Sequence, residues 1–329
     1  MSLILMSQEK QLSGILIVNK PKGMISKDVS RWLTRRIGKK VKLGHVGTLD
    51  PAADGVLPLL IGKATRLQDD LLELPKSYYC EMQLGYETDT LDLDGKVITR
   101  KAYEKVDERN LHSIAESFEG LIEQVPPIYS AVKFQGKPLY SYAREGRENE
   151  VDLEKLKRQV TVYACRALSY ANGLVSFEVT CSKGTYIRVL AKKFAEAMGT
   201  VGTVTRLCRT QAAGVKIEQA YSLEEIEQFL IDNKSIGEPI LTPLKEVALN
   251  LPSLAVDQNQ GRKLLAGQLL TISREKVEFS DVDWKRYSTS SSGGLKTLIL
   301  NESSEIFALA AIKQLSPGIL QLGMKRSLL

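Results

Sequence analysis

Residues 44–65, GHVGTLDPAADGVLPLLIGKAT, place a single carboxylate, Asp50, between a leucine and a proline in a turn rich in glycine and proline. An aspartate before a proline commonly bonds to its own backbone, so the residues alone favour a turn-stabilising role and a catalytic role about equally. Two carboxylates, Asp50 and Asp54, would also suit glycoside hydrolysis, but no pattern places them on opposite sides of a sugar. A phosphate-binding P-loop is excluded, because Leu57 stands where its first glycine belongs and Ala64 where its serine or threonine belongs.

A basic segment precedes this turn. Residues 20–42 contain nine lysines and arginines and one acid, Asp28, whereas the whole chain of 329 residues carries a net charge of only +6. Such clustering indicates a polyanionic partner, with a solvated helix face as the alternative. Ser26 is expected to cap a helix with separate apolar and basic faces, made respectively of Val29, Trp32, Leu33 and Ile37 and of Arg31, Arg35 and Lys39.

Strand and helix patterns alternate along the first 250 residues. A short buried strand is expected at residues 15–18, and further strands on both sides of the acidic turn at residues 89–95. Residues 160–181 alternate apolar and polar side chains around an Asn-Gly pair, which predicts a β-hairpin. Residues 184–199 return to helical spacing. The predicted fold class is α+β with a mixed, largely antiparallel sheet.

The last part of the chain has a different pattern. Short strand-like runs follow one another from residue 269 to residue 324, with a serine- and glycine-rich stretch at residues 287–294 between them. We therefore expect a small β-rich second domain over residues 251–329.

Composition argues against several classes of protein. No run approaches the roughly 20 apolar residues of a membrane-spanning helix, and the N-terminus lacks the basic region of a secretory signal. The four cysteines are widely spaced and only two histidines accompany them, so we expect no metal site and a reducing, cytoplasmic location. The acidic turn imitates a calcium loop, but Thr90 and Lys101 occupy its first and twelfth positions.

Five blocks of sequence, in this order and spacing, resemble those of the TruB-type tRNA pseudouridine synthases: residues 19–33, 44–66, 76–95, 126–146 and 181–191. The resemblance implies an enzyme that isomerises the T-loop uridine at tRNA position 55 to pseudouridine after flipping the base out. It also implies a pseudouridine synthase catalytic domain over residues 1–250, in which residues 124–160 clasp the tRNA T-arm, and a PUA-like RNA-binding domain over residues 251–329. No cofactor, no metal and no obligatory protein partner are expected.

The resemblance assigns three catalytic residues. Asp50 matches the essential aspartate, acting as nucleophile or as base. Arg188 matches the arginine that pairs with it, the alternative being a surface contact with phosphate. Tyr78 matches the tyrosine that lies against the target base, the alternative being a core position in a strand.

Five further residues are assigned to substrate binding. His45 matches the histidine that displaces the flipped base, and Lys20 opens the basic segment. Tyr186 and Leu207 match nucleotide contacts, with core packing as the alternative, and Asp92 matches an aspartate near the active site, with a plain turn role as the alternative.

Two departures from the family pattern are visible. Asp54 stands where a small or hydroxyl residue is expected, and Cys208 interrupts an expected Leu-Arg-Arg-Thr. Two rival functions remain in view: a guide-dependent relative that works with a small RNA and protein partners on ribosomal RNA, and a non-catalytic RNA chaperone that grips the T-arm.

Overall fold

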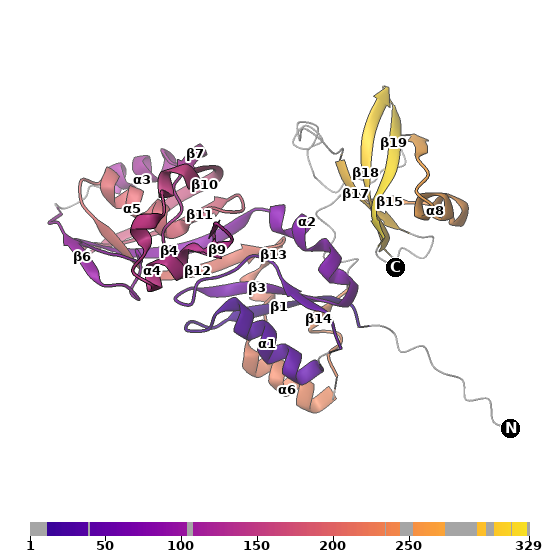
Figure 1. Ribbon diagram of the computed structural model, residues 1–329, viewed down its shortest axis with the longest axis horizontal. Helices are drawn as coiled ribbons and strands as arrows, with labels where there is room; N and C mark the ends of the chain where they lie inside the picture. The colour runs from indigo at the N-terminus through magenta and orange to yellow at the C-terminus, as the bar shows by residue number, and fades with distance from the viewer. Residues whose placement is uncertain are drawn as a thin grey trace.

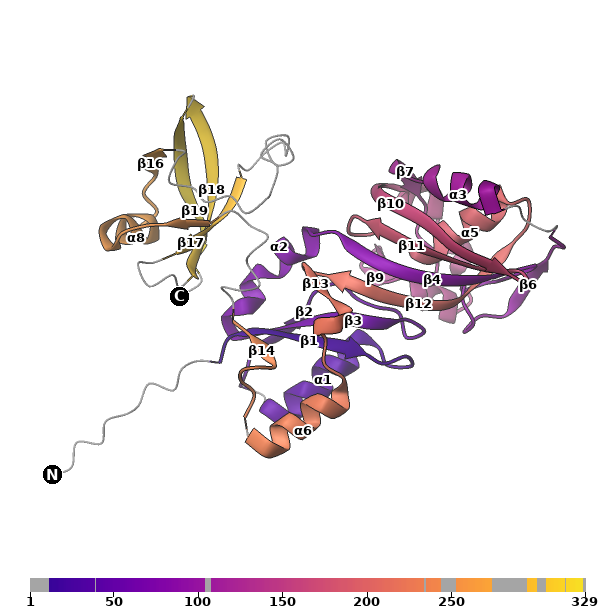
Figure 2. The same cartoon turned by 180° about the vertical axis from the view of Figure 1, so that it is seen from behind.

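A long mixed sheet and a separate five-stranded sheet organise the fold (Figures 1 and 2). The computed structural model describes residues 12–38, 40–103, 108–233, 235–243, 253–273, 295–300, 306–316 and 318–327. Within them the long sheet has the strand order β14 (Leu241–Thr242), β1 (Gly14–Lys20), β3 (Asp54–Ile61), β12 (Gly202–Ala212), β4 (Lys76–Leu84), β11 (Leu174–Cys181), β10 (Arg158–Ala171) and β7 (Gly120–Gln124). Strand β13 (Val215–Lys216) pairs with β12, and β2 (Leu43–His45) pairs with β3.

Helices cover this sheet at its two ends. Helices α1 (Ser26–Ile37) and α6 (Leu223–Asn233) lie side by side near β1, and α3 (Glu108–Glu116) and α5 (Ile187–Ala197) lie near β10 and β11 (Figures 1 and 2). The shorter helices are α2 (Gln68–Glu73) and α4 (Leu139–Arg144), with 3-10 turns at Gly62–Leu67, Glu148–Glu150, Leu153–Leu156 and Ile217–Gln219. Two small hairpins complete this part, β5 (Tyr86–Thr88) with β6 (Val97–Arg100) and β8 (Lys133–Phe134) with β9 (Lys137–Pro138).

The predicted hairpin at residues 160–181 is confirmed as β10 and β11. Asn172 and Gly173 both have positive φ, as a two-residue turn between antiparallel strands requires. Phe177 on β11 is fully buried, and its ring stacks on that of Phe194 from α5 at a centroid distance of 5.2 Å. This contact joins the sheet to the helix that carries Arg188.

Helix α1 differs from the expectation at its first residue. Ser26 lies inside the first turn, and Ile25 holds the cap position without a side-chain hydrogen bond. The reason is that the Ser26 hydroxyl bonds to the backbone of Leu49 instead. Val29 and Leu33 face the core as expected, Arg31 and Arg35 are exposed, and Lys39 lies outside the described residues.

The sheet brings β3 and β12 together at Gly55. Every described pair of the long sheet is antiparallel except β3 with β12, in which Asp54 lies opposite Cys208 and Gly55 opposite Arg209. Gly55 has φ +102°, and a Cβ added there would lie 2.3 Å from the Arg209 carbonyl oxygen. Only glycine therefore allows this close approach, four residues after Pro51 of the Asp50 turn.

The C-terminal residues form a second sheet with a core of its own. Its strand order is β15 (Ser253–Ala255), β17 (Leu295–Leu300), β18 (Ile306–Ser316), β19 (Ile319–Ser327) and β16 (Leu270–Ser273). The expected β-rich tail is thus confirmed, and α8 (Gln258–Leu265), capped by Asp257, was not expected. The serine- and glycine-rich stretch and the boundary near residue 250 lie outside the described residues, so the division into two domains stays a prediction. No helix of the described residues is long and apolar enough to cross a membrane.

We predict that Gly55→Ala destabilises the protein more than a matched glycine substitution does. Gly120 has a similar φ of +104° but nothing within 4 Å of an added Cβ, so Gly120→Ala costs only backbone strain of about 1–3 kcal/mol. Gly55→Ala adds a steric conflict with backbone, worth about a further 1–3 kcal/mol. Urea unfolding of the two variants measures the difference, and equal losses of stability would contradict the role given to Gly55.

Candidate active site

Asp50 lies in a turn that several contacts hold in place. The Ser26 hydroxyl accepts a hydrogen bond from the Leu49 amide at 2.8 Å and donates to the Leu49 carbonyl at 3.1 Å. On the other side, the Gly23 amide donates to the Pro51 carbonyl at 2.8 Å. The Asp50 side chain remains 38% exposed, so the turn fixes the backbone and leaves the carboxylate accessible.

A buried arginine pairs with this carboxylate. Arg188, in the first turn of α5, is 4% exposed and lies 2.8 Å from Asp50 Oδ2 and 3.4 Å from Asp92 Oδ2. Its remaining donors reach the carbonyl oxygens of Thr90 at 2.6 Å and Tyr129 at 3.0 Å. Arg188 is therefore not at the surface, where the alternative role of a contact with phosphate would place it. The contacts instead hold the guanidinium in one orientation against Asp50.

Asp92 is a second carboxylate that contacts the Arg188 guanidinium. Its Oδ1 accepts hydrogen bonds from the Thr90 hydroxyl at 2.5 Å and from the Asp94 amide at 3.1 Å, which leaves Oδ2 facing Arg188. The acidic turn is therefore built around Asp92, and this carboxylate reaches Asp50 only through the arginine.

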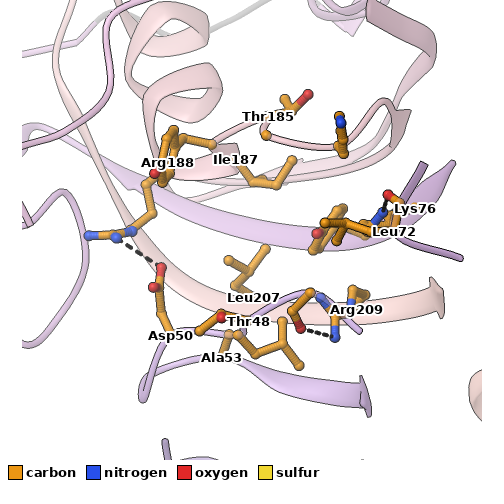
Figure 3. Close-up of a pocket in the computed structure, with 16 residues that line it drawn as sticks. Thr48, Asp50, Ala53, Leu72, Lys76, Thr185, Ile187, Arg188, Leu207 and Arg209 are labelled. Atoms are coloured by element: carbon orange, nitrogen blue, oxygen red, sulfur yellow. Dashed lines mark hydrogen bonds and ion pairs between the residues drawn. The ribbon is translucent and has the colours of Figure 1, made fainter. Parts of the chain in front are cut away.

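A cavity of about 210 Å³ lies beside the ion pair (Figure 3). It lies between the Asp50 turn, the start of α5 and the sheet strands β4 and β12. The sequence-assigned residues that line it are Asp50, Tyr78, Tyr186, Arg188 and Leu207. A water needs about 10–15 Å³ on this scale, so the cavity has room for a much larger group.

Tyr78 and Tyr186 are held in different ways. Tyr78 is 8% exposed, and burial raises the pKa of its hydroxyl, an effect that Arg209 opposes through its charge and a hydrogen bond. Tyr186 exchanges two backbone hydrogen bonds with the buried Gln124 side chain, at 2.9 and 3.3 Å. Its ring lies under the Arg158 guanidinium at 4.8 Å. Gln124 and Arg158 stand at the two ends of residues 124–160, so that segment is tied directly to the cavity.

His45 and Lys20 lie outside this cavity. His45 on β2 places Nδ1 3.4 Å from the Ser30 hydroxyl, and burial lowers the pKa of its ring. Lys20 is fully buried, and its ammonium donates to the carbonyls of Pro21 at 2.9 Å and Met24 at 2.6 Å. Burial lowers the pKa of Lys20 to about 8, against the opposing pull of Asp54 and Asp50. Their assignments to substrate binding stay predictions.

Comparison with known proteins identifies the family. A family model described as TruB family pseudouridylate synthase (N terminal domain) matches residues 35–187. A tRNA pseudouridine synthase B of Hydrogenovibrio crunogenus is 38% identical over 270 residues, which cover 82% of this chain and 85% of that protein. One of Clostridium kluyveri is 39% identical over 257 residues, covering 78% and 84%. The chain belongs to the TruB family of pseudouridylate synthases.

Solved structures show the same fold at greater distance. A chain in the crystal structure of a Cbf5-Nop10-Gar1 complex matches with a TM-score of 0.70 and 23% identity over 96% of this chain and 85% of that one. A chain in an archaeal box H/ACA sRNP Nop10-Cbf5 complex gives a TM-score of 0.66 at 21% identity, over 96% and 86%. The expected α+β fold of pseudouridine synthase type is confirmed.

The two departures from the TruB pattern are neighbours in space. Cys208 lies opposite Asp54 in the parallel pair, and burial together with a hydrogen bond to Asp54 raises the pKa of the thiol to about 12. Asp54 also attracts the buried Lys20. The acid and the thiol at these two positions are therefore neighbours. Asp54 begins β3, the strand that follows the Asp50 turn, and Cys208 lies beside it on β12.

Three residues of the site were not found from the sequence. Ser26 was interpreted as a helix cap, and Lys76 and Arg209, which also line the cavity, were given no role. For Lys76 and Arg209, the signal available in the sequence was that each of them lies within a strand. Lys76 shares the buried parity of β4 with Tyr78, Cys80 and Met82, a rare place for a lysine.

In this TruB family member we predict that Ser26→Ala lowers both stability and activity. The variant leaves the buried Leu49 amide and carbonyl unpaired, which costs about 1–3 kcal/mol, and it frees the backbone next to Asp50. Urea unfolding and a turnover assay measure the two effects. Ser117→Ala is the matched control, because the exposed Ser117 hydroxyl bonds only to the Ile114 carbonyl in its own helix region. A stable Ser26→Ala protein with unchanged turnover would contradict the anchoring role.

Proposed function

We propose that the protein isomerises the T-loop uridine at tRNA position 55 to pseudouridine, with Asp50 as the catalytic carboxylate. Conversion of uridine to pseudouridine in tRNA is the activity that the names of its TruB relatives state. One observation carries the assignment of Asp50: its accessible carboxylate is paired at 2.8 Å with the buried Arg188 at one end of the cavity.

The chemistry requires an ionised carboxylate beside the anomeric carbon. Arg188 places a cation against the Asp50 carboxylate at 2.8 Å. The bond between C1′ and N1 breaks with both electrons leaving on uracil. Asp50 either bonds to C1′ or takes the C2′ proton.

The second half of the reaction joins the turned base through carbon. C5 of uracil bonds to C1′ as Asp50 leaves that carbon or returns the proton to C2′, the C5 proton is lost to solvent, and N1 gains a proton, so the composition is unchanged. Tyr78, Tyr186 and Leu207 bound the cavity in which the base turns. The reaction consumes neither a redox equivalent nor a nucleotide cofactor.

Residues 124–160 are proposed to clasp the T-arm. Tyr140 is 39% exposed and Arg144 lies over its ring at 5.4 Å, an arrangement that suits stacking on a base beside a phosphate. Tyr142, in contrast, is buried with Leu139 and Val151 in a small core, which leaves it to stabilise the segment. The Tyr129 carbonyl bonds to Arg188, so docking of the T-arm bears directly on the catalytic ion pair.

Action on free tRNA without an obligatory protein partner is proposed over the guide-dependent alternative. The support is the chain's own T-arm segment and the high identity to proteins named tRNA pseudouridine synthase B. A non-catalytic chaperone has no need of a buried arginine paired with an accessible aspartate. Cytoplasmic location is proposed because tRNA is the substrate and all four cysteines are free thiols.

The proposal predicts tritium release from tRNA that carries tritium at C5 of its uridines. Wild-type protein should release the label of one T-loop uridine, and Asp50→Asn should release none while still binding tRNA, because only the reacting carboxylate is altered. Filter binding and scintillation counting measure the two properties. Failure of the wild type to release tritium would contradict the catalytic claim, and release by Asp50→Asn would contradict the role of Asp50.

A second prediction concerns the basic face of α1. Replacing Arg31 and Arg35 together with alanine should weaken tRNA binding and reduce the slope of log K against log salt by about 0.7–0.9 for each lost phosphate contact. Arg166→Ala is the control, since Arg166 is exposed and paired with Glu178 much as Arg31 is with Asp28. An unchanged salt slope in the double variant would rule out this face as a phosphate contact.

A further inference from the structure

The cavity has a second charged end that the chemistry at Asp50 does not use. Lys76, the first residue of β4, and Arg209, on the neighbouring β12, are 4% and 1% exposed, and both line the cavity. Figure 3 shows them on the far side of Leu207 from Asp50 and Arg188. Among the described residues no carboxylate forms an ion pair with either side chain. Both side chains bond instead to backbone carbonyls, and Arg209 also bonds to the Tyr78 hydroxyl.

Both cations keep donors free for a further partner. Lys76 Nζ donates to the carbonyls of Leu72 at 2.7 Å and Leu74 at 2.9 Å, and an ammonium has a third proton. Arg209 donates through Nε to the Val56 carbonyl at 2.7 Å and through Nη2 to the Gly47 carbonyl at 3.0 Å. A guanidinium has five N–H donors in all.

The two cations lie together beneath Gly47. A Cβ added to this residue, which has φ +73°, would lie 3.2 Å from Arg209 Nη1 and 3.4 Å from Lys76 Cε. Two buried like charges this close disfavour each other, and groups perturbed in this way cluster at functional sites. Glycine at position 47 keeps the space above them open.

We propose that Lys76 and Arg209 form an anion-stabilising end of the cavity that binds the carbonyl oxygens of the uracil once it has detached from the ribose. The inference rests on the proposed function. When the bond between C1′ and N1 breaks, the electron pair on the base spreads over N1 and the two carbonyl oxygens. Donors fixed in a water-poor site where this charge develops lower the barrier more than they improve binding of the neutral nucleotide.

Tyr78 links the two ends of the cavity. Burial raises the pKa of its hydroxyl, so the phenol stays protonated, and Arg209 donates a hydrogen bond to its oxygen. The hydroxyl proton is then directed away from Arg209 and is free to be donated to the base. Asp50 and Arg188 thus act on the sugar, whereas Lys76, Arg209 and Tyr78 act on the departing uracil.

Single-turnover tritium release tests the proposal through Lys76. Lys76→Met should lower the rate of the chemical step about 10²-fold, the usual effect of removing one oxyanion donor, with the Kd for tRNA nearly unchanged. Lys76→Arg keeps a cation and should recover most of the rate. Lys192→Met is the matched control. Lys192 lies on α5, outside the cavity, and its ammonium pairs with Glu87 at 2.9 Å. Replacing Lys192 should leave the single-turnover rate as in the wild type.

The pH profile separates a charge effect from loss of packing. The pKa of Lys76 is lowered to about 8, first by burial and then by Arg209 and Lys183, while Glu73 and Cys181 oppose the shift. Since the protonated amine is the active form, the wild-type rate should fall as pH rises through about 8. Lys76→Arg stays charged, so its rate should not fall in that range. This comparison remains available even if Lys76→Met fails to fold.

Three results would overturn the inference. One is a Lys76→Met variant with normal single-turnover rate but weaker binding and a reduced salt slope, which would make Lys76 a phosphate contact. The second is an alkaline fall in rate that is the same in Lys76→Arg as in the wild type. The third is a folded Lys76→Arg protein as slow as Lys76→Met. Each is read against an active wild type, so failure of this inference is distinct from failure of the proposed function.

Discussion

The ion pair between Asp50 and Arg188 is the interaction on which the rest of the site depends. Burying a guanidinium costs desolvation free energy, which a carboxylate partner offsets. A contact of 2.8 Å between Arg188 and Asp50 supplies such a partner, and two other segments support the guanidinium, the acidic turn through Asp92 and Thr90 and residues 124–160 through Tyr129. The ion pair is therefore oriented by elements far apart in the sequence.

The sheet supplies the geometry that this pair needs. The parallel contact between β3 and β12 is closed by Gly55, which brings Arg209 under the Asp50 turn. Ser26 then fixes the Leu49 backbone from α1. The cavity is consequently charged at both ends, with the ion pair of Asp50 and Arg188 at one end and the buried cations Lys76 and Arg209 at the other. Such a division suits a reaction in which an electron pair moves from sugar to base and back.

Much of this arrangement could be predicted from the sequence, and the remainder could not, for identifiable reasons. Alternating side chains and the Asn172-Gly173 turn predicted the hairpin correctly, because they reflect local geometry. The resemblance to the TruB family implied that Arg188 pairs with Asp50, and the two side chains do form an ion pair. Ser26 was misinterpreted because a serine before an apolar run caps a helix more often than it binds a distant backbone. Arg209 and Lys76 were given no role because their significance lies in the lack of a carboxylate partner among the described residues, which only tertiary structure reveals. Asp54 became understandable once Cys208 and Lys20 were found beside it.

The central claim, that Asp50 and Arg188 act as one unit, is tested most directly by a double-mutant cycle on the single-turnover rate. The members are the wild type, Asp50→Glu, Arg188→Lys and the double variant, each of which keeps the charges and alters only reach and geometry. Residues in direct contact couple by about 0.5–3 kcal/mol, so the double variant should lose clearly less rate than the two single losses combined. Strictly additive losses would contradict the account, because they would mean that the arginine acts independently of the aspartate.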